Sequence, residues 1–282
     1  MGQILITGAG GNVGREVVSH LLARGEPVKA AVFRVDPNAL PGEAPQVRFD
    51  FADPATYAEA LTGVDRLFLL RPPQLVDMKR TLAPVIDFAM ARGVRRIVFL
   101  SLQGVEWNVF TPHHWVEKYL RAQKAPFTFL RPNFYMQNLS TFYRQDIRIR
   151  HEIYLPAGKG KTAFVDVRDI GEVAARLLTE EGHIGKAYTL SGPDSLDYFQ
   201  VAQTLSSVLS REIRYANPSV SAYVARLREQ KMAEDFIKVQ KMLYFVVRHN
   251  FSASAKSDAE ALLGQKPTSL RKFAEDNIEA WL

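Results

Sequence analysis

The sequence predicts an α/β protein in which a doubly wound parallel sheet is followed by a small, mostly helical C-terminal lobe. Over the first 132 residues, short apolar runs of strand length alternate with amphipathic segments of helical spacing. Most of these runs are apolar at successive positions, which is typical of parallel strands covered by helices on both faces. The first run leads into a glycine-rich turn and a helix, an order found at the start of many such sheets.

The opening strand and helix follow from their residue patterns. We expect a strand at Ile4–Ile6, a turn from Gly8 to Gly14, and then a helix. Gly25 stands where a left-handed cap would end that helix. The helix carries one apolar stripe at helical spacing, made by Val13, Val17, Val18, Leu21 and Leu22. Further strands are expected at residues 28–33, 47–51, 67–70, 97–100 and 127–130.

The segments between these strands carry helix signals. Asp53 and Pro54 are typical of an N-cap and a first helical position, and Gly63 would end that helix. Residues 74–92 have helical spacing, in which Pro84 either kinks the helix or marks its true start.

Beyond residue 132 the pattern becomes mixed. We expect strands at 164–165 and 187–190, a helix at 169–178, and mainly helices in the last 90 residues. Residues 1–132, with returns to the sheet near 160–192, would form the nucleotide-binding core. Residues 133–282 would form a substrate-side lobe, and no linker clearly separates the two.

The glycine spacing points to a dinucleotide. Gly8, Gly11 and Gly14 fit G-x-x-G-x-x-G, whereas the alternative G-x-G-x-x-G would place the bulky Val13 where close packing is needed. Such a turn lets main-chain N–H groups and a helix N-terminus approach a diphosphate. The candidate contacts of this Rossmann-like unit are Gly8, Gly11, Asn12, Val13 and Gly14.

The residue at the end of the second strand favours NADP over NAD. NAD-binding units of this fold place an acidic residue there, where it accepts hydrogen bonds from the ribose. This chain has Arg34, whose guanidinium matches a 2′-phosphate but cannot accept such bonds. Asp36 lies two residues on and keeps NAD as the alternative.

Two further groups follow strands and are expected at the carboxyl edge of the sheet, where ligands of open parallel sheets bind. Asp50 and Phe51 stand where adenine would be contacted, through the carboxylate and the next backbone N–H. Leu70, Arg71 and Pro72 follow the fourth strand. Each of these residues could equally be a loop capping group.

Composition excludes several classes of site. The 282-residue chain has no cysteine, which rules out disulfides, thiolate catalysis and cysteine-ligated metals. Its net charge of +6 and pI near 9.4 come from scattered basic residues without a nucleic-acid motif, so nucleic acid is not an expected partner. We expect neither a signal peptide nor a membrane span, and therefore a cytoplasmic protein.

The usual catalytic pair of short-chain dehydrogenases is absent. None of the tyrosines is followed four residues later by lysine, so no lysine can lower a tyrosine pKa at that spacing. After Ser101, the spacing is taken by His113 and Glu117. His113 is therefore the candidate proton donor, with Glu117 one turn away to orient it or raise its pKa. A simple surface His–Glu pair is the alternative. No metal site is predicted, since His113 and His114 point to different helix faces.

Several segments together resemble the NmrA-like family of atypical short-chain dehydrogenase/reductases, and are similar to its NADPH-dependent quinone reductases and triphenylmethane-dye reductases. They are TGAGGNVG at 7–14, RRIVFLS at 95–101, HHWVEKYL at 113–120, FLRPNFYMQN at 129–138, VDVRDIGEVAARLL at 165–178 and AYTLSGPDSLDYFQVAQTLS at 187–206. The resemblance implies an NADP-binding domain with a small C-terminal substrate lobe. Carried over, Pro132 and Asn133 become cofactor contacts, and Ser101 joins them, while Arg131 is structural.

The resemblance leaves two functions open. A reductase would bring a quinone or dye, activated by its own conjugation, against the nicotinamide in an aromatic pocket. The candidate lining residues are Trp107, Phe110, Phe134, Tyr135, Phe142 and Tyr143, and Tyr135 is also a second candidate proton donor. The alternative is a non-catalytic redox sensor that binds NADP(H) and a protein partner. A sugar epimerase is disfavoured because no tyrosine base stands at the required place, and a hydrolase because no G-x-S-x-G segment exists.

Overall fold

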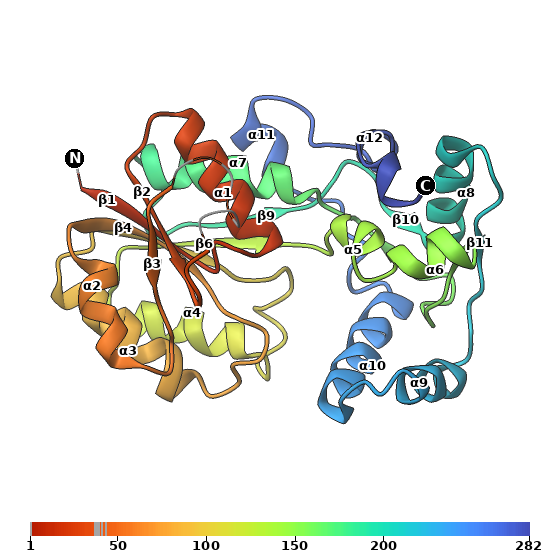
Figure 1. Cartoon of the computed structure of the whole chain (residues 1–282), viewed down its shortest axis with the longest axis horizontal. Coiled ribbons are helices and arrows are strands. Elements are labelled where there is room, and N and C mark those ends of the chain that lie inside the picture. The colour runs from red at the N-terminus through yellow and green to blue at the C-terminus, as the bar shows by residue number, and fades with distance from the viewer. Residues whose placement is uncertain (1, 37–39, 41, 43) are drawn as a thin grey trace. The chain divides into compact units, whose positions relative to one another are not determined.

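The computed structural model of the chain describes residues 2–36, 40, 42 and 44–282. These residues fall into two compact units. Unit 1 comprises residues 1–132, 167–190 and 258–265, and unit 2 comprises residues 133–166, 191–257 and 266–282. The chain therefore passes more than once from one unit to the other (Figure 1).

Unit 1 is organised by a parallel sheet of seven strands within the described residues. Its order is β3-β2-β1-β4-β5-β6-β9, and every neighbouring pair runs parallel. The direction of winding reverses between β1 and β4, so the carboxyl ends of these two strands form the switch point at which such sheets bind ligands. The strands are β1 (Gln3–Thr7), β2 (Val28–Val32), β3 (Gln46–Arg48), β4 (Val64–Leu70), β5 (Arg96–Leu100), β6 (Phe127–Pro132) and β9 (Ala187–Leu190).

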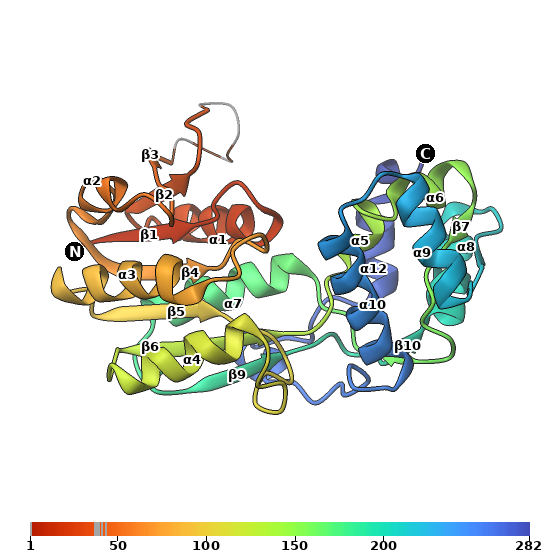
Figure 2. The ribbon, with the colours of Figure 1, turned by 90° about the horizontal axis from the view of Figure 1, so that it is seen from below.

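Helices cover both faces of the sheet, which confirms the predicted doubly wound, Rossmann-like architecture (Figures 1 and 2). One face carries α1 (Asn12–Ala23) and α7 (Val167–Thr179), with α11 (Ala259–Leu263) against α7 and β9. The other face carries α2 (Tyr57–Leu61), α3 (Met78–Ala91) and α4 (Pro112–Ala122).

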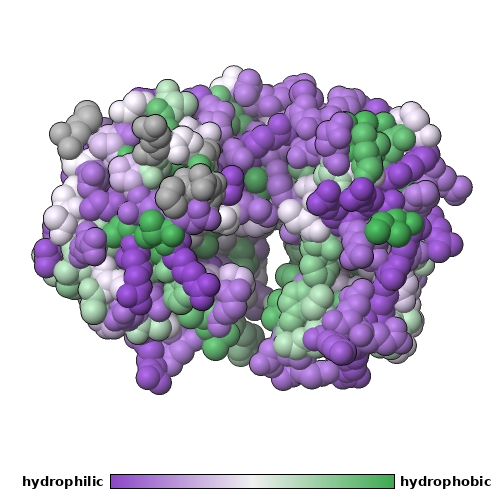
Figure 3. All heavy atoms as spheres, viewed as in Figure 1, coloured by the Kyte–Doolittle hydropathy of each residue, from purple (hydrophilic) through white to green (hydrophobic). Residues whose placement is uncertain are grey.

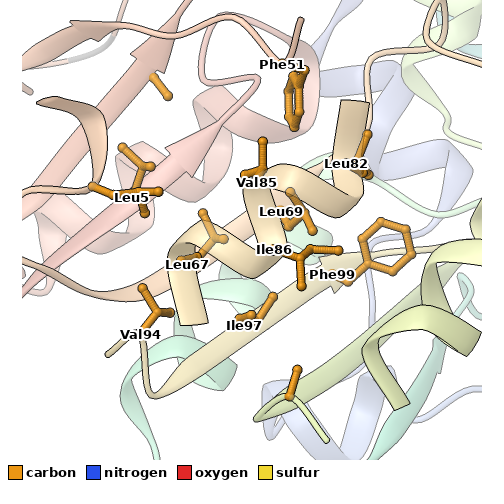
Figure 4. Packing of buried hydrophobic residues seen from close by; sticks show 14 of the residues in the cluster. Leu5, Phe51, Leu67, Leu69, Leu82, Val85, Ile86, Val94, Ile97 and Phe99 are labelled. Atoms are coloured by element: carbon orange, nitrogen blue, oxygen red, sulfur yellow. The ribbon is translucent and has the colours of Figure 1, made fainter. Parts of the chain in front are cut away.

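The helix α3 is packed on the sheet by an apolar stripe. Figure 4 shows Val85 and Ile86 of this helix directed at Leu67 and Leu69 of β4, and all four side chains are buried. Burial of such side chains stabilises the fold by roughly 1.5–3 kcal/mol each. Pro84 lies inside α3 and does not mark its start; the helix begins after Asp77, whose carboxylate accepts from the N–H of Arg80 at 3.2 Å.

The contact between α1 and α7 depends on a glycine. A Cβ at Gly171 would lie 2.5 Å from the Cβ of Glu16 and 2.8 Å from its carbonyl carbon. Since real Cβ atoms do not approach so closely, only glycine lets the two helix backbones meet here. The position of α1 is thus fixed by its contacts with the strands and by its contact with α7.

Some boundaries differ from those expected. The third strand ends at Arg48 instead of residue 51; just beyond it, the Phe49 ring packs on the rings of Phe51 and Tyr57. The helix expected from Asp53 begins with a short 3-10 turn, η1 (Pro54–Thr56), capped by the Asp53 carboxylate. Residues 164–165 lie outside the named strands, where Val165 forms an isolated bridge with Tyr135.

Unit 2 is mainly helical and has its own apolar core. Its largest buried side chain is Trp281, whose indole N–H donates to the carbonyl of Leu139 at 2.9 Å. Two small sheets pair β7 with β11 and β8 with β10. The elements are α5 (Gln137–Ser140), α6 (Arg144–Ile149), β7 (Glu152–Ile153), β8 (Lys161–Thr162), β10 (Leu196–Asp197), α8 (Tyr198–Leu209), β11 (Arg214–Tyr215), α9 (Val220–Glu229), α10 (Glu234–Arg248), α12 (Leu270–Asp276) and η2 (Ile278–Ala280).

The surface seen in Figure 3 is mostly hydrophilic, and hydrophobic residues appear there as patches. Within the described ranges, no helix has both the length and the apolar composition needed to cross a bilayer.

Candidate functional site

The glycine turn lies at the carboxyl end of β1 and leads directly into α1. The N–H of Gly11 donates to the carbonyl of Gly8 at 3.0 Å, and the N–H of Arg15 donates to the carbonyl of Gly11 at 2.9 Å. Asn12 and Val13 lie in the first turn of α1, where backbone N–H groups have no intrahelical acceptors. No side chain caps the helix in their place. Gly11 and Asn12 are exposed, and the turn therefore presents free donors and a positive helix end to solvent.

Two glycines of the motif are required by close contacts. A Cβ at Gly14 would lie 2.1 Å from the carbonyl oxygen of Gly8, so α1 can start against the strand end only without a side chain there. Gly8 has a φ of +65°, and a Cβ on it would lie 2.9 Å from Cδ2 of Leu70. Gly8 and Gly14 of the motif thus have a steric basis.

Thr7, which the sequence reasoning passed over, ties the two strands of the switch point together. Its buried hydroxyl accepts from the N–H of Leu70 at 2.8 Å and donates to the carbonyl of Phe68 at 3.1 Å. A threonine directly before the glycine turn was the available signal. This bond fixes the end of β4, and with it Leu70, beside the turn.

Arg34 follows β2 and is exposed. Within the described part of the chain, its guanidinium makes no hydrogen bond or ion pair. An exposed guanidinium without a protein partner is available to an anionic ligand, which is the geometry that the NADP prediction requires.

Asp50 and Phe51 have fewer groups free to contact adenine than the sequence suggested. One carboxylate oxygen of Asp50, Oδ1, accepts from the N–H of Ala52 at 2.9 Å, so the side chain also caps its own loop. The Phe51 ring is buried in the same apolar cluster as Val85 of α3 (Figure 4), and its carbonyl accepts from the Tyr57 hydroxyl at 2.6 Å. A ligand contact by Phe51 can therefore come only from its backbone.

Arg71 holds the loop that follows β4. Its Nη1 donates to the carbonyls of Pro72 at 3.0 Å and Pro73 at 3.2 Å, while Nε is buried without a partner in the described chain. Burial lowers the pKa of Arg71. The arginine thus shapes the Leu70–Pro72 segment and keeps one donor unused.

Ser101 belongs to a buried charge network. Its hydroxyl donates to Oε1 of Glu117 at 2.7 Å, and Glu117 also receives two bonds from Arg131, at 2.9 Å from Nε and 2.6 Å from Nη2. Glu106 pairs with the same guanidinium. The Glu117 and Arg131 side chains are 7% and 10% exposed. Charge pairing at Glu117 raises the pKa of Arg131, against the opposing effect of its burial.

This network changes the expectation for His113. Glu117 is occupied by Ser101 and Arg131, so no bond from it orients the imidazole. Burial, together with the charge of Arg71, lowers the pKa of His113 to about 3, the opposite of the predicted rise. His113 is therefore neutral near pH 7, and its Nδ1 is buried with no protein partner among the described residues.

Pro132 and Asn133 lie at the end of β6 and just beyond it. The Pro132 carbonyl accepts from the N–H of Gln103 at 3.0 Å. The side-chain amide of Asn133 donates to the carbonyl of Ser252 at 2.9 Å, and its oxygen accepts from the N–H of Phe134 at 2.7 Å. Both polar ends of Asn133 are thus used within unit 2.

The predicted aromatic residues have different environments. In unit 1, Trp107 and Phe110 are 88% and 95% exposed. In unit 2, Tyr143 is buried, Phe142 stands edge-on to it with ring centroids 4.8 Å apart, and both line a cavity. Phe134 packs on the unit 2 core. Tyr135 is half-buried, and burial raises its pKa to about 12, so its hydroxyl stays protonated.

In the chain as described, no three histidine or acidic side chains gather in a way that could hold a metal ion. A glycine turn with unpaired N–H groups, at the switch point of a doubly wound sheet, defines the class of dinucleotide-binding Rossmann-like proteins. Within that class, the chain belongs to the NmrA-like family, whose sequence model matches residues 1–274.

Named relatives of this chain include reductases. It is 30% identical over 290 residues to the NAD(P)H azoreductase of Xenophilus azovorans, covering 99% of each chain. The NADPH-dependent quinone oxidoreductase of Escherichia coli, solved with NADPH, is 25% identical with a TM-score of 0.86, covering 98% of this chain and 99% of that one. The triphenylmethane reductase of Citrobacter sp. is 24% identical with a TM-score of 0.87, covering 99% and 100%, and shows the shared fold.

The buried network yields a prediction about stability. Glu117→Gln removes the charge that compensates Arg131, and leaving one buried charge unpaired costs about 3–5 kcal/mol of unfolding free energy. The matched change Glu106→Gln alters a partner that is 44% exposed and should cost about 1 kcal/mol or less. Urea denaturation of both variants measures these losses, and equal losses would contradict a buried Glu117–Arg131 pair.

His113 predicts a pH dependence of stability. Between pH 6.5 and about 3 the unfolded chain binds a proton at His113 that the folded chain does not, so stability falls as pH falls below 6.5. At pH 5 this costs about 2 kcal/mol. The variant His113→Asn lacks this contribution and should lose less stability between pH 7 and pH 5 than the parent protein. Parallel losses in chemical denaturation would show that His113 titrates normally.

Proposed function

We propose that this protein is an NADPH-dependent reductase that transfers hydride to a small conjugated acceptor such as a quinone or an azo or triphenylmethane dye. The observation that carries the proposal is the glycine turn at the β1–β4 switch point, with its unpaired N–H groups at the start of α1. The named reductases among its relatives support the same class of reaction.

The residues present fit the cofactor. The N–H groups of Asn12 and Val13 would receive the diphosphate, because they lack acceptors and stand at the positive end of α1. Arg34 would pair with the 2′-phosphate, since its guanidinium has no partner in the described chain. NADPH supplies a hydride when it is bound, so the protein has to position and shield it.

The protein offers no strong acid near neutral pH among its candidate donors. His113 is neutral above a pKa of about 3, and Tyr135 holds its proton up to a pKa of about 12. A reaction that needs concerted protonation, as at an isolated ketone, is poorly served by such groups. Acceptors that stabilise added electrons by conjugation need no such acid, which favours quinones and dyes. A neutral His113 can still donate or accept a hydrogen bond.

The direct test is turnover. Purified protein should oxidise NADPH steadily when a panel of quinones and azo dyes is supplied, followed by the loss of absorbance at the reduced nicotinamide band. Gly11→Asp should abolish both turnover and NADPH binding, because it adds a negative charge where the diphosphate would lie. A Cβ at Gly11 would meet only the Gly8 carbonyl, at 3.4 Å, so the variant should fold, as its thermal denaturation would verify.

The same experiment separates the reductase from the redox sensor. Tight NADPH binding without turnover on any acceptor would contradict the reductase and support the sensor. Absence of binding to either pyridine nucleotide would contradict both functions.

Arg34 sets the cofactor preference in this proposal. Arg34→Ala should weaken NADPH binding by about 10- to 100-fold, since a hydrogen bond to a charged group contributes roughly 1.5–3 kcal/mol. Binding of NADH should change little. Arg80→Ala is the control, because Arg80 is an exposed arginine on α3. Calorimetric titration of both nucleotides gives the comparison; equal losses for NADPH and NADH would refute the 2′-phosphate contact.

A further inference from the structure

Two segments of unit 2 contain basic residues but no acidic ones. The first is residues 153–165 and the second is residues 236–257. Their basic residues are Lys159 and Lys161 in the first segment and Lys238, Lys241, Arg248 and Lys256 in the second. They account for six of the 36 basic residues of the chain and for none of its 30 acidic residues, so the rest of the chain has no formal net charge. The net charge of +6 therefore equals the charge of these two segments.

The two segments lie side by side in unit 2. A Cβ at Gly160 would lie 2.0 Å from the carbonyl oxygen of Val247, so the turn at residues 158–161 packs directly on the end of α10. The side-chain oxygen of Asn250 accepts from the N–H of Lys161 at 2.8 Å. The basic residues of the turn are therefore neighbours of those at the end of the helix.

Most of these cations have no counter-ion in the protein. Lys238 pairs with Asp235 at 3.0 Å, whereas the other five are exposed and make no ion pair in the part of the chain that the structure describes. Asp197 stands opposite Lys161 in the β10–β8 pair, and its carboxylate caps α8 by accepting from the N–H of Gln200 at 2.9 Å. The region is thus positively charged and complementary to an anionic partner.

The same region exposes large apolar side chains. Helix α10 packs on the unit 2 core through buried residues such as Tyr244. Outside that core contact, four apolar side chains are 48%, 47%, 58% and 69% exposed, namely Val239, Met242, Phe245 and Phe251. The first three are spaced three residues apart on the helix, and the Phe245 ring packs on the His249 imidazole with centroids 4.2 Å apart. Apolar side chains gathered on a surface mark an interaction site.

We propose that this region, which we call the α10 surface, docks on a membrane that contains anionic lipids. The α10 surface consists of Val239, Met242, Phe245 and Phe251 with Lys159, Lys161, Lys241 and Arg248. Its apolar side chains would enter the boundary between headgroups and acyl chains, and its basic residues would lie against the lipid phosphates.

The composition of the α10 surface favours a lipid partner over a nucleic acid. Single-stranded nucleic acids bind to aromatic rings on which bases stack, and the aliphatic Val239 and Met242 offer no ring. Docking on a membrane face needs no spanning helix. The surface lies wholly in unit 2, so its occupancy does not depend on the proposed reductase function.

Binding to vesicles tests the proposal. The full chain, without nucleotide, is mixed with vesicles of equal parts phosphatidylserine and phosphatidylcholine, or of phosphatidylcholine alone, and bound protein is measured by flotation. The mixed vesicles should bind at least tenfold more tightly, since each basic residue near an anionic surface contributes roughly fivefold. Added salt should weaken this binding. Equal binding to both vesicles, no binding, or tighter binding of a single-stranded oligonucleotide would overturn the proposal.

Charge reversals locate the basic part of the surface. Lys159→Glu combined with Lys241→Glu should weaken binding to the mixed vesicles at least tenfold. The control combines Lys79→Glu with Arg80→Glu on α3, which changes the net charge of the protein by the same amount at two exposed positions of unit 1. It should weaken binding far less. Equal losses would show that the overall charge, and not the α10 surface, attracts the vesicles.

Polar substitutions test the apolar part. Phe245→Gln combined with Phe251→Gln keeps every charge and should weaken vesicle binding at least tenfold, because two exposed rings no longer enter the bilayer. The control combines Trp107→Gln with Phe110→Gln, since these side chains of unit 1 are also exposed. Thermal denaturation verifies that all variants fold. Unchanged binding of the Phe245 and Phe251 variant, or an equal loss in the control, would overturn insertion at the α10 surface.

Discussion

The close approach of Gly14 to the carbonyl of Gly8 is the contact on which the nucleotide site depends. A side chain at Gly14 would stand 2.1 Å from that oxygen, so α1 can begin directly at the end of β1 only because none is present. This contact aims the first N–H groups of the helix at the switch point. Gly171 of α7 permits a second close approach to α1, where a side chain would lie 2.5 Å from the Cβ of Glu16.

The candidate site has a different pair of side chains at the spacing of a known catalytic pair. The spacing that a tyrosine and a lysine fill in many short-chain dehydrogenases holds His113 and Glu117 here. Glu117 does not act on His113, since its two oxygens are committed to Ser101 and Arg131. The buried Glu117–Arg131 pair is costly to break, so it is suited to supporting the site in a fixed geometry. The neutral imidazole of His113 is suited to hydrogen bonding and not to delivering a proton.

The sequence predicted the fold, the family and the glycine turn because each depends on local patterns: apolar runs, helical spacing and residues without side chains. It could not predict interactions between distant segments. Thr7 bonds to Leu70 across 63 residues, and Arg131 on β6 reaches Glu117 on α4 and Glu106 in the turn before that helix. The predicted rise of the His113 pKa was also wrong, because the burial of His113 and its proximity to Arg71 arise only in the folded chain. The roles of the predicted cofactor and substrate residues stay predictions.

In the binding mode proposed for this protein, main-chain amides at the start of α1 hold the diphosphate of NADP. The most direct measurement is a crystal structure of the full chain grown with NADP. We predict diphosphate oxygens within hydrogen-bonding distance of the Asn12 and Val13 N–H groups, and the 2′-phosphate against the guanidinium of Arg34. Density for the nucleotide away from the glycine turn, or a turn that stays empty at saturating NADP, would show that the turn does not hold the diphosphate.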